Sequence, residues 1–168
     1  NGGGMENYNC TLTMIGSCFY NNSSNSYGGG LNNEAGGSLI LINDVFTNNS
    51  NPGFGGGLRV SGSSTNQIIN CTFTNNSGGT GAAIRVASLG TATVNIHNSI
   101  FRGNYSGSDF TSTNADVSNG ATLFIDTSCL QSSQSCTGCL VANTDPLFVA
   151  ISNPLGNDGF FGTADDGL

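Results

Sequence analysis

The chain has 168 residues, a formal net charge of −7 and only three cationic side chains, all of them Arg. Gly, Asn, Ser and Thr account for 87 of the 168 residues, which disfavours helices because these residues compete with the helical backbone or leave it flexible. Three scattered Arg cannot neutralise a phosphate backbone or an anionic bilayer surface, so the composition excludes nucleic-acid binding and membrane-surface binding. No apolar run approaches the roughly 20 residues of a membrane helix, whereas a hydrophobic share of 36% that includes ten Phe is enough for a core.

The chain begins at Asn1 without an initiator Met or a signal peptide, which predicts a processed or partial chain. Its length is typical of one domain. We expect repeated coils over residues 1–140 and a loop-rich C-terminal segment or cap over residues 141–168.

Two motifs recur together along the chain. The first contains an apolar residue followed by polar residues, and its copies lie 27, 27, 28 and 29 residues apart. The apolar residues are Phe19, Phe46, Phe73, Phe101 and Leu130. The second is a Gly-rich triplet that recurs at steps of 26, 27 and 26 residues, beginning at Gly2, Gly28, Gly55 and Gly81. Two independent markers with one shared period predict a repeat protein.

Short β-type runs lie between these markers, at residues 38–42, 91–96 and 122–125. Each is too short for a helix and is bounded by Gly, Asn or Ser, as strands are. A unit made of such strands cannot bury its apolar face alone, so neighbouring units must stack and share a core. The sequence therefore predicts an all-β solenoid, a parallel β-helix with a repeat close to the observed step of 27 residues per coil.

In such a stack, equivalent residues of successive coils form columns along the axis. We expect the Phe column to stack inside the core. A second column follows three residues later and consists of Asn22, Asn49, Asn76 and Asn104. Stacked amides form hydrogen bonds along an axis, and Asn tolerates tight bends, so we expect this column to be structural. An exposed Asn row that contacts sugar is the alternative, and the Gly triplets are expected to supply positive φ at a corner.

The pairing of F-x-N-N with G-G-G/A-L/I over residues 2–133 resembles the repeats of polymorphic outer-membrane proteins and related pectate-lyase-like β-helices. The segments 145–149 and 158–168 are similar to the closing segment of secreted bacterial surface proteins of the choice-of-anchor type. The resemblance implies a right-handed, single-stranded parallel β-helix, secretion, and a location outside the cell or at its surface. It implies function only loosely, because this fold hosts lyases, adhesins and structural rods.

Six cysteines are present, and disulfides are the default expectation for a secreted chain. Cys10 and Cys18 are near enough in sequence to bridge, and Cys71 has no evident partner, so we expect it to be a buried free thiol. Two of the remaining three can bridge across a turn: Cys129, Cys136 and Cys139. Cys18 cannot pair with Cys129, since four coils separate them. The C-x-x-C spacing of the last two alternatively suggests zinc or redox chemistry.

Few residues in the coils suggest catalysis. His97 alternates with apolar residues of a predicted strand, so we expect it to face solvent, and no nucleophile or carboxylate lies near it in the sequence. Lyase or hydrolase chemistry would need an acid cluster or paired carboxylates, and the acidic residues of adjacent coils share no column. Arg59 and Arg85 occupy equivalent positions and form an exposed two-step ladder. This ladder is a candidate contact for a carboxylate of another subunit or of an acidic sugar.

The densest acidic cluster lies near the C-terminus and contains Asp158, Asp165 and Asp166. Hard oxygen ligands on a Gly-rich loop suit Ca²⁺, although the spacing is not that of an EF-hand loop. Calcium is therefore the one cofactor that the sequence suggests, and a solvated turn is the alternative.

These observations favour a non-enzymatic, extracellular structural or adhesive module. Open coil ends favour head-to-tail stacking into a homo-oligomer or filament, and a glycan is a further candidate partner. The alternative is a carbohydrate-binding or polysaccharide-lyase-like module of a larger secreted protein, whose mark would be an aromatic or acidic row on an exposed strand face. A regular Thr ladder, which ice binding would need, does not repeat from coil to coil.

Overall fold

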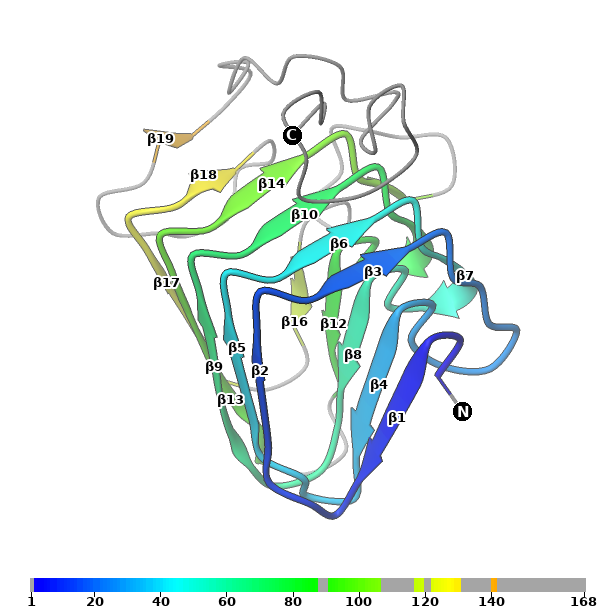
Figure 1. Ribbon diagram of the computed structural model, residues 1–168, viewed down its shortest axis with the longest axis vertical. Helices are drawn as coiled ribbons and strands as arrows, with labels where there is room; N and C mark the ends of the chain where they lie inside the picture. Colours follow the sequence, from blue (N-terminus) through cyan, green and yellow to red (C-terminus); the bar gives the residue numbers. More distant parts are fainter. Residues whose placement is uncertain (1, 88–90, 107–116, 120–121, 131–139, 142–168) are drawn as a thin grey trace.

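The computed structural model describes residues 2–87, 91–106, 117–119, 122–130 and 140–141. Within these ranges every regular element is a β-strand, and the strands stack in parallel to form a solenoid (Figure 1). The prediction of an all-β parallel β-helix is confirmed. No helix that could span a membrane occurs among the described residues. Residues 142–168, where a C-terminal cap is predicted, lie outside the described part of the chain.

Four parallel sheets form the walls of the solenoid. The first sheet consists of β1 (Met5–Tyr8), β4 (Leu31–Glu34), β8 (Leu58–Val60), β12 (Ile84–Val86) and β16 (Val117–Asn119). The second consists of β2 (Leu12–Ile15), β5 (Leu39–Ile42), β9 (Thr65–Ile69), β13 (Thr93–His97) and β17 (Thr122–Asp126). The third consists of β3 (Cys18–Tyr20), β6 (Val45–Thr47), β10 (Thr72–Thr74), β14 (Ile100–Arg102), β18 (Cys129–Leu130) and β19 (Leu140–Val141). The short fourth sheet consists of β7 (Ser50–Phe54), β11 (Ser77–Thr80) and β15 (Tyr105–Ser106).

Each coil visits the sheets in the same order, so that strands one coil apart in the sequence become hydrogen-bonded neighbours (Figure 1). Phe46 pairs with Phe19 on one side and with Phe73 on the other. All the paired strands are parallel, and parallel neighbours cannot be joined by a short hairpin. The chain passes through the other walls of the coil before it returns beside the previous strand. The three strands predicted at residues 38–42, 91–96 and 122–125 correspond to β5, β13 and β17.

The core lies inside the coils and is built from columns of identical or similar side chains. The rings of Phe19, Phe46, Phe73 and Phe101 stack nearly parallel, with successive centroids 4.6, 4.8 and 5.1 Å apart. These distances follow the spacing of strands within a parallel sheet. The period of the Phe motif is thus the length of one turn, which places each ring on the ring of the coil before it.

The corners of the coil use residues with positive φ. At the corner after the third sheet, the left-handed residues are Asn21, Asn48, Asn75 and Gly103. At the corner between the second and third sheets they are Gly16, Asn43, Asn70, Asn98 and Thr127. Asn and Gly adopt this conformation at low cost, which explains their frequency in the sequence.

The Asn column lies in the interior and not on the surface. Asn49, Asn76 and Asn104 are fully buried. Nδ2 of each amide donates to Oδ1 in the next coil at 3.0 Å, from Asn22 to Asn49, from Asn49 to Asn76 and from Asn76 to Asn104. The expectation that this column also makes the bends is wrong, because the preceding residues Asn21, Asn48 and Asn75 adopt the positive φ. In each Asn-Asn pair the first residue therefore forms the bend and the second forms the hydrogen-bonded column.

A second buried amide row, which the repeat pattern does not reveal, crosses from the first sheet to the second. Asn7 Nδ2 donates to Asn33 Oδ1 at 2.7 Å, and Asn33 Nδ2 donates to Asn66 Oδ1 at 3.0 Å. In the first sheet, the residue that pairs with Asn33 in the next coil is Val60, which has no amide. Asn66 supplies the amide in its place.

The Gly triplets lie where the chain enters the first sheet, and the first members Gly28, Gly55 and Gly81 have positive φ. The second position is closed to side chains for another reason. A Cβ at Gly56 would collide with the backbone oxygens of Ser77 and Ala82. The triplet thus combines a left-handed corner with a close approach of neighbouring coils.

Candidate functional site

The outer face of the first sheet gathers most of the charged side chains of the coils. Leu58 and Val60 point into the core, so the alternation of a strand directs Arg59 outward. The register places Arg59 between Asn32 of one neighbouring strand and Arg85 of the other. The two-step Arg ladder predicted from the sequence is therefore present in the register.

Arg59 is held tightly, contrary to the expectation that it is exposed. Only 6% of its side chain is accessible. Its Nη1 lies 3.0 Å from Asn32 Oδ1 and 3.4 Å from Glu34 Oε2, and its guanidinium carbon lies 4.1 Å from the centre of the Tyr27 ring. Burial lowers the pKa of Arg59, and the charge of Glu34 opposes that shift. The Arg59 guanidinium therefore makes its contacts with other residues of this surface and is not available as a free cation.

Two aromatic rings lie over the Arg ladder. Tyr27 and Phe54 are the residues that precede two successive Gly triplets, and their ring centroids are 6.3 Å apart at an angle of 33°. Arg85 lies under Phe54, with 5.9 Å between its guanidinium carbon and the ring centre. Tyr27 is 38% exposed and Phe54 is 43% exposed. We call these two rings the aromatic platform.

The aromatic platform was not found from the sequence, although a signal existed. Tyr27 and Phe54 are 27 residues apart, which is one turn of the repeat. They escape notice because the other copies of the motif carry Asn1 and Thr80 at this position, so no aromatic column extends along the chain.

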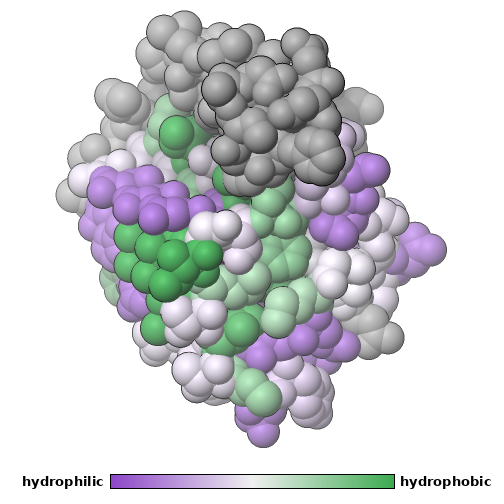
Figure 2. Space-filling view, in the orientation of Figure 1, coloured by the Kyte–Doolittle hydropathy of each residue, from purple (hydrophilic) through white to green (hydrophobic). Residues whose placement is uncertain are grey.

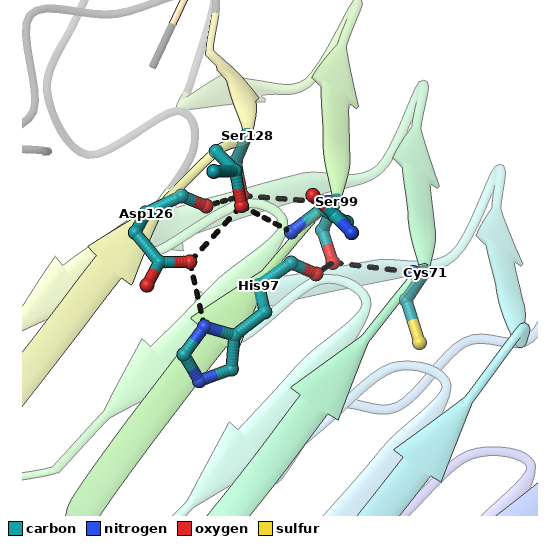
Figure 3. Close-up of polar contacts among 7 residues, drawn as sticks. Cys71, His97, Ser99, Asp126 and Ser128 are labelled. Carbon is teal, nitrogen blue, oxygen red and sulfur yellow. Dashed lines mark hydrogen bonds and ion pairs between the residues drawn. The ribbon is translucent and has the colours of Figure 1, made fainter. Parts of the chain in front are cut away.

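A second polar cluster lies at the end of the second sheet, where His97 Nδ1 is 2.6 Å from Asp126 Oδ1 (Figure 3). These residues are paired in neighbouring strands, and both side chains are about two-fifths exposed. The hydrogen bond from His97 lowers the pKa of Asp126. His97 faces solvent as expected, but the expectation that it has no carboxylate nearby is wrong, because the register brings one from 29 residues along the chain.

Behind this pair runs a corner column that begins at the partly buried Ser17 and continues through the buried side chains of Asp44, Cys71, Ser99 and Ser128. Ser17 N donates to Asp44 Oδ1 at 2.6 Å. Further along the column, Cys71 N donates to Ser99 Oγ and Ser99 N donates to Ser128 Oγ, each at 3.1 Å (Figure 3). Burial raises the pKa of Asp44, although the N–H groups of Ser17 and Ile42 oppose that shift. Burial also raises the pKa of the Cys71 thiol to about 11.

The cysteines differ from the predicted disulfide framework. Cys10 is an exposed free thiol, so the predicted bridge to Cys18 is not formed. The reason is geometric: β2 separates the two residues, and its four residues span about 13 Å, more than the Cα separation of about 7 Å that a disulfide allows. Cys71 is the buried free thiol that was expected. Cys136 and Cys139, the candidate partners of Cys129, lie outside the described residues.

The predicted calcium ligands Asp158, Asp165 and Asp166 also lie outside the described residues. Within the described part of the chain, no group of three or more His, Cys, Asp or Glu side chains is placed to hold a metal ion. A shallow groove of about 370 Å³ runs along the fourth sheet, between β7, β11 and Tyr105. Its described lining is mostly Ser, Gly and Asn and carries no ionisable group except the Tyr105 phenol.

Comparisons with known proteins give one match. A family model described as a right-handed β-helix region matches residues 1–144. No curated protein and no solved structure matches the chain.

Proposed function

The chain belongs to the right-handed β-helix family, and we propose that it is a non-enzymatic structural and adhesive module of a secreted or surface protein whose copies stack head to tail into a filament. The observation that carries this proposal is the outer edge of the first coil. Among the described residues, β1, β2 and β3 are the terminal strands of their sheets, so each has one edge that faces no other described strand.

The core is also open at this edge. Met5, Leu12 and Met14 pack against the core but are only partly buried, whereas their counterparts Leu31, Leu39 and Leu41 in the next coil are fully buried. Figure 2 shows hydrophobic side chains on this face of the molecule, the face on which β1–β3 lie nearest the viewer in Figure 1. A further coil would bury these side chains and complete the strand pairing.

The Asn column defines the hydrogen bonds that a coil added at this edge would have to complete. Within the column, Asn49 donates through Nδ2 both to Phe19 O in the preceding coil and to Asn76 Oδ1 in the following one. Asn22 stands at the outer edge, where an incoming Asn would donate to its amide oxygen and an incoming backbone carbonyl would accept from its Nδ2. In the C-terminal coils of a second copy, the positions three residues after Leu130 and Val141 are Ser133 and Thr144, which lie outside the described residues and carry hydroxyl groups in place of amides.

Carboxylates of the coils are held by other residues of the chain, and this supports the proposal that the module is not an enzyme. Glu34 contacts Arg59, and Asp44 accepts backbone N–H groups. Asp126 is bound to His97.

The test compares two substitutions on the edge strand β2. Met14 points toward the core and Thr13 points outward. An inward charge on an edge strand blocks the addition of another strand. We therefore expect filaments or concentration-dependent oligomers of the wild type and of Thr13→Lys, and monomers of Met14→Lys, in sedimentation velocity and electron microscopy at neutral pH.

Circular dichroism melts of both variants would check that each remains folded. A wild type that stays monomeric at every accessible concentration would overturn the stacking proposal. Closed dimers without longer species would replace the head-to-tail arrangement with an edge-to-edge one. Release of unsaturated uronides from polygalacturonate would overturn the non-enzymatic part and favour the polysaccharide-lyase-like alternative.

A further inference from the structure

We infer that the outer face of the first sheet binds an uncharged glycan, whose sugar rings stack on the aromatic platform of Tyr27 and Phe54. This inference is independent of coil stacking, because the aromatic platform lies on the side wall of the solenoid and not on the edge of the first coil.

The first observation is the exposure of two aromatic rings side by side. An isolated exposed aromatic residue needs no explanation, but these rings lie in successive coils with centroids 6.3 Å apart. One face of each ring is turned toward an Arg, at 4.1 Å for Tyr27 and 5.9 Å for Phe54. Their exposed area is therefore contributed by the outer faces and edges, which are open to a flat ligand.

The second observation concerns charge. Each guanidinium already occupies the inner, electron-rich side of a ring, so a second cation on the outer side would meet a weakened attraction and a like charge. Arg59 is compensated by Glu34 at 3.4 Å, so it does not attract an anion strongly. The chain as a whole carries a net charge of −7, which also disfavours an anionic ligand. The aromatic platform therefore suits an uncharged ligand with an apolar face.

The third observation is the row of oxygen acceptors beside the rings. Arg59 contacts both Glu34 and the Tyr27 ring, so Glu34 lies near this ring. Asn32 also binds Arg59, and it lies 3.4 Å from Glu6. Tyr8, an exposed ring, is paired with Glu34 in the register. Carboxylates that retain exposed oxygens accept hydrogen bonds from hydroxyl groups. Sugar rings combine an apolar C–H face with a rim of hydroxyls, and this surface offers a partner for each.

The orientation of the aromatic platform defines how much ligand it holds. The two rings follow each other along the solenoid axis, and the next member of the same column is Thr80, which pairs with Phe54. The stacking surface thus ends after two rings. We expect it to engage two neighbouring units of a glycan chain that runs along the axis, with weak affinity for a single unit.

The test is isothermal titration calorimetry of the wild-type chain with defined hexasaccharides. The neutral probes are cellohexaose, xylohexaose, mannohexaose and chitohexaose, and the acidic probe is hexagalacturonate. We expect at least one neutral probe to bind, and Phe54→Ala to weaken that binding at least about tenfold, because an aromatic ring supplies a large part of a stacking contact. Tyr27→Phe keeps the ring and the contact with Arg59, so it should preserve binding.

Phe124→Ala is the matched control, since Phe124 is 58% exposed but lies on the second sheet. It should leave the affinity unchanged. Equal losses in Phe54→Ala and Phe124→Ala would overturn the assignment of the site. Binding of hexagalacturonate alone would overturn the uncharged class, and the absence of heat with every probe at millimolar concentration would overturn the inference as a whole.

Discussion

The two corners that flank the third sheet carry buried polar columns, but the columns differ in how much they vary. After the third sheet, four coils have Asn at the same position: Asn22, Asn49, Asn76 and Asn104. Before the third sheet, the corner column changes from Ser17 to Asp44, Cys71, Ser99 and Ser128. Both columns lie in the same register, so the backbone alone does not explain the difference.

The difference follows from what each position must provide. In the Asn column, Asn76 Oδ1 accepts from the backbone N–H and from Nδ2 of Asn49, while its own Nδ2 donates to Phe46 O and to Asn104 Oδ1. Only a side-chain amide supplies an acceptor and two donors of this geometry. In the corner column, the one contact that Asp44, Ser99 and Ser128 share is the acceptance of an N–H from the coil before them, while their other hydrogen bonds differ from coil to coil. Hydroxyl and carboxylate oxygens both meet that need.

The largest expected effect comes from breaking the Asn column in its middle. Asn76→Ala leaves the buried N–H of Asn49 without an acceptor, removes one of the two acceptors of Asn49 Nδ2, and removes a donor from Phe46 O. Each unsatisfied buried group costs about 1–3 kcal/mol, so we expect a loss of about 3–5 kcal/mol in the free energy of unfolding. Urea denaturation followed by circular dichroism would measure it.

The adjacent residue provides the control for this experiment. Asn75 has a positive φ of 53° and is half-buried at the bend. Asn75→Gly keeps the left-handed conformation, and we expect a change within about 0.5 kcal/mol. Similar losses in both variants would contradict the division of tasks within the Asn-Asn pair.

The corresponding substitution in the corner column is expected to cost less. Ser99→Ala removes the acceptor of one buried group, the N–H of Cys71, and a donor to the backbone oxygen of His97. We expect a loss of about 1–2 kcal/mol in the same denaturation experiment. A loss as large as that of Asn76→Ala would show that the two columns are equivalent in energy.

Asp44→Ser tests whether the corner column needs only an acceptor. Burial raises the pKa of Asp44 in the folded state, so the folded chain holds a proton that the unfolded chain has lost once the pH exceeds 3.8. The stability of the wild type should therefore decrease as the pH rises from 3.8 through the folded pKa. Asp44→Ser should abolish this decrease without lowering the melting temperature at pH 7. Identical pH profiles of the two proteins would contradict this account.

The smallest effect is expected on the exposed outer face of the second sheet. The hydrogen bond from His97 lowers the pKa of Asp126, so the pair stabilises the fold above the ordinary carboxyl pKa and loses that contribution as the pH falls through the folded pKa. His97→Gln should return the pKa of Asp126 toward its usual value in an NMR titration and change the melting temperature only slightly. An unchanged titration would show that another group lowers the pKa.

The sequence is most informative where one physical requirement recurs in every coil. The Phe and Gly markers predict the period, the parallel stacking and the core column, because each coil must bury the same side chain on its neighbour. In the three Asn-Asn copies the roles of the two residues could not be separated, since both residue types are identical, and Gly103 before Asn104 in the fourth copy was the one signal for the bend position. Only the backbone angles distinguish Asn75 at the bend from Asn76 in the ladder.

The sequence by itself determined the architecture of this protein, since a strict period of apolar and Gly residues leaves a stacked β-solenoid as the way to bury a shared core. The tertiary structure decided the contacts between residues one coil apart that do not repeat. It brings Asp126 to His97, Glu34 to Arg59 and Phe54 to Tyr27. Each of these contacts occurs once and extends into no column, so the repeated motifs do not mark it, and the register of neighbouring strands places the partners together.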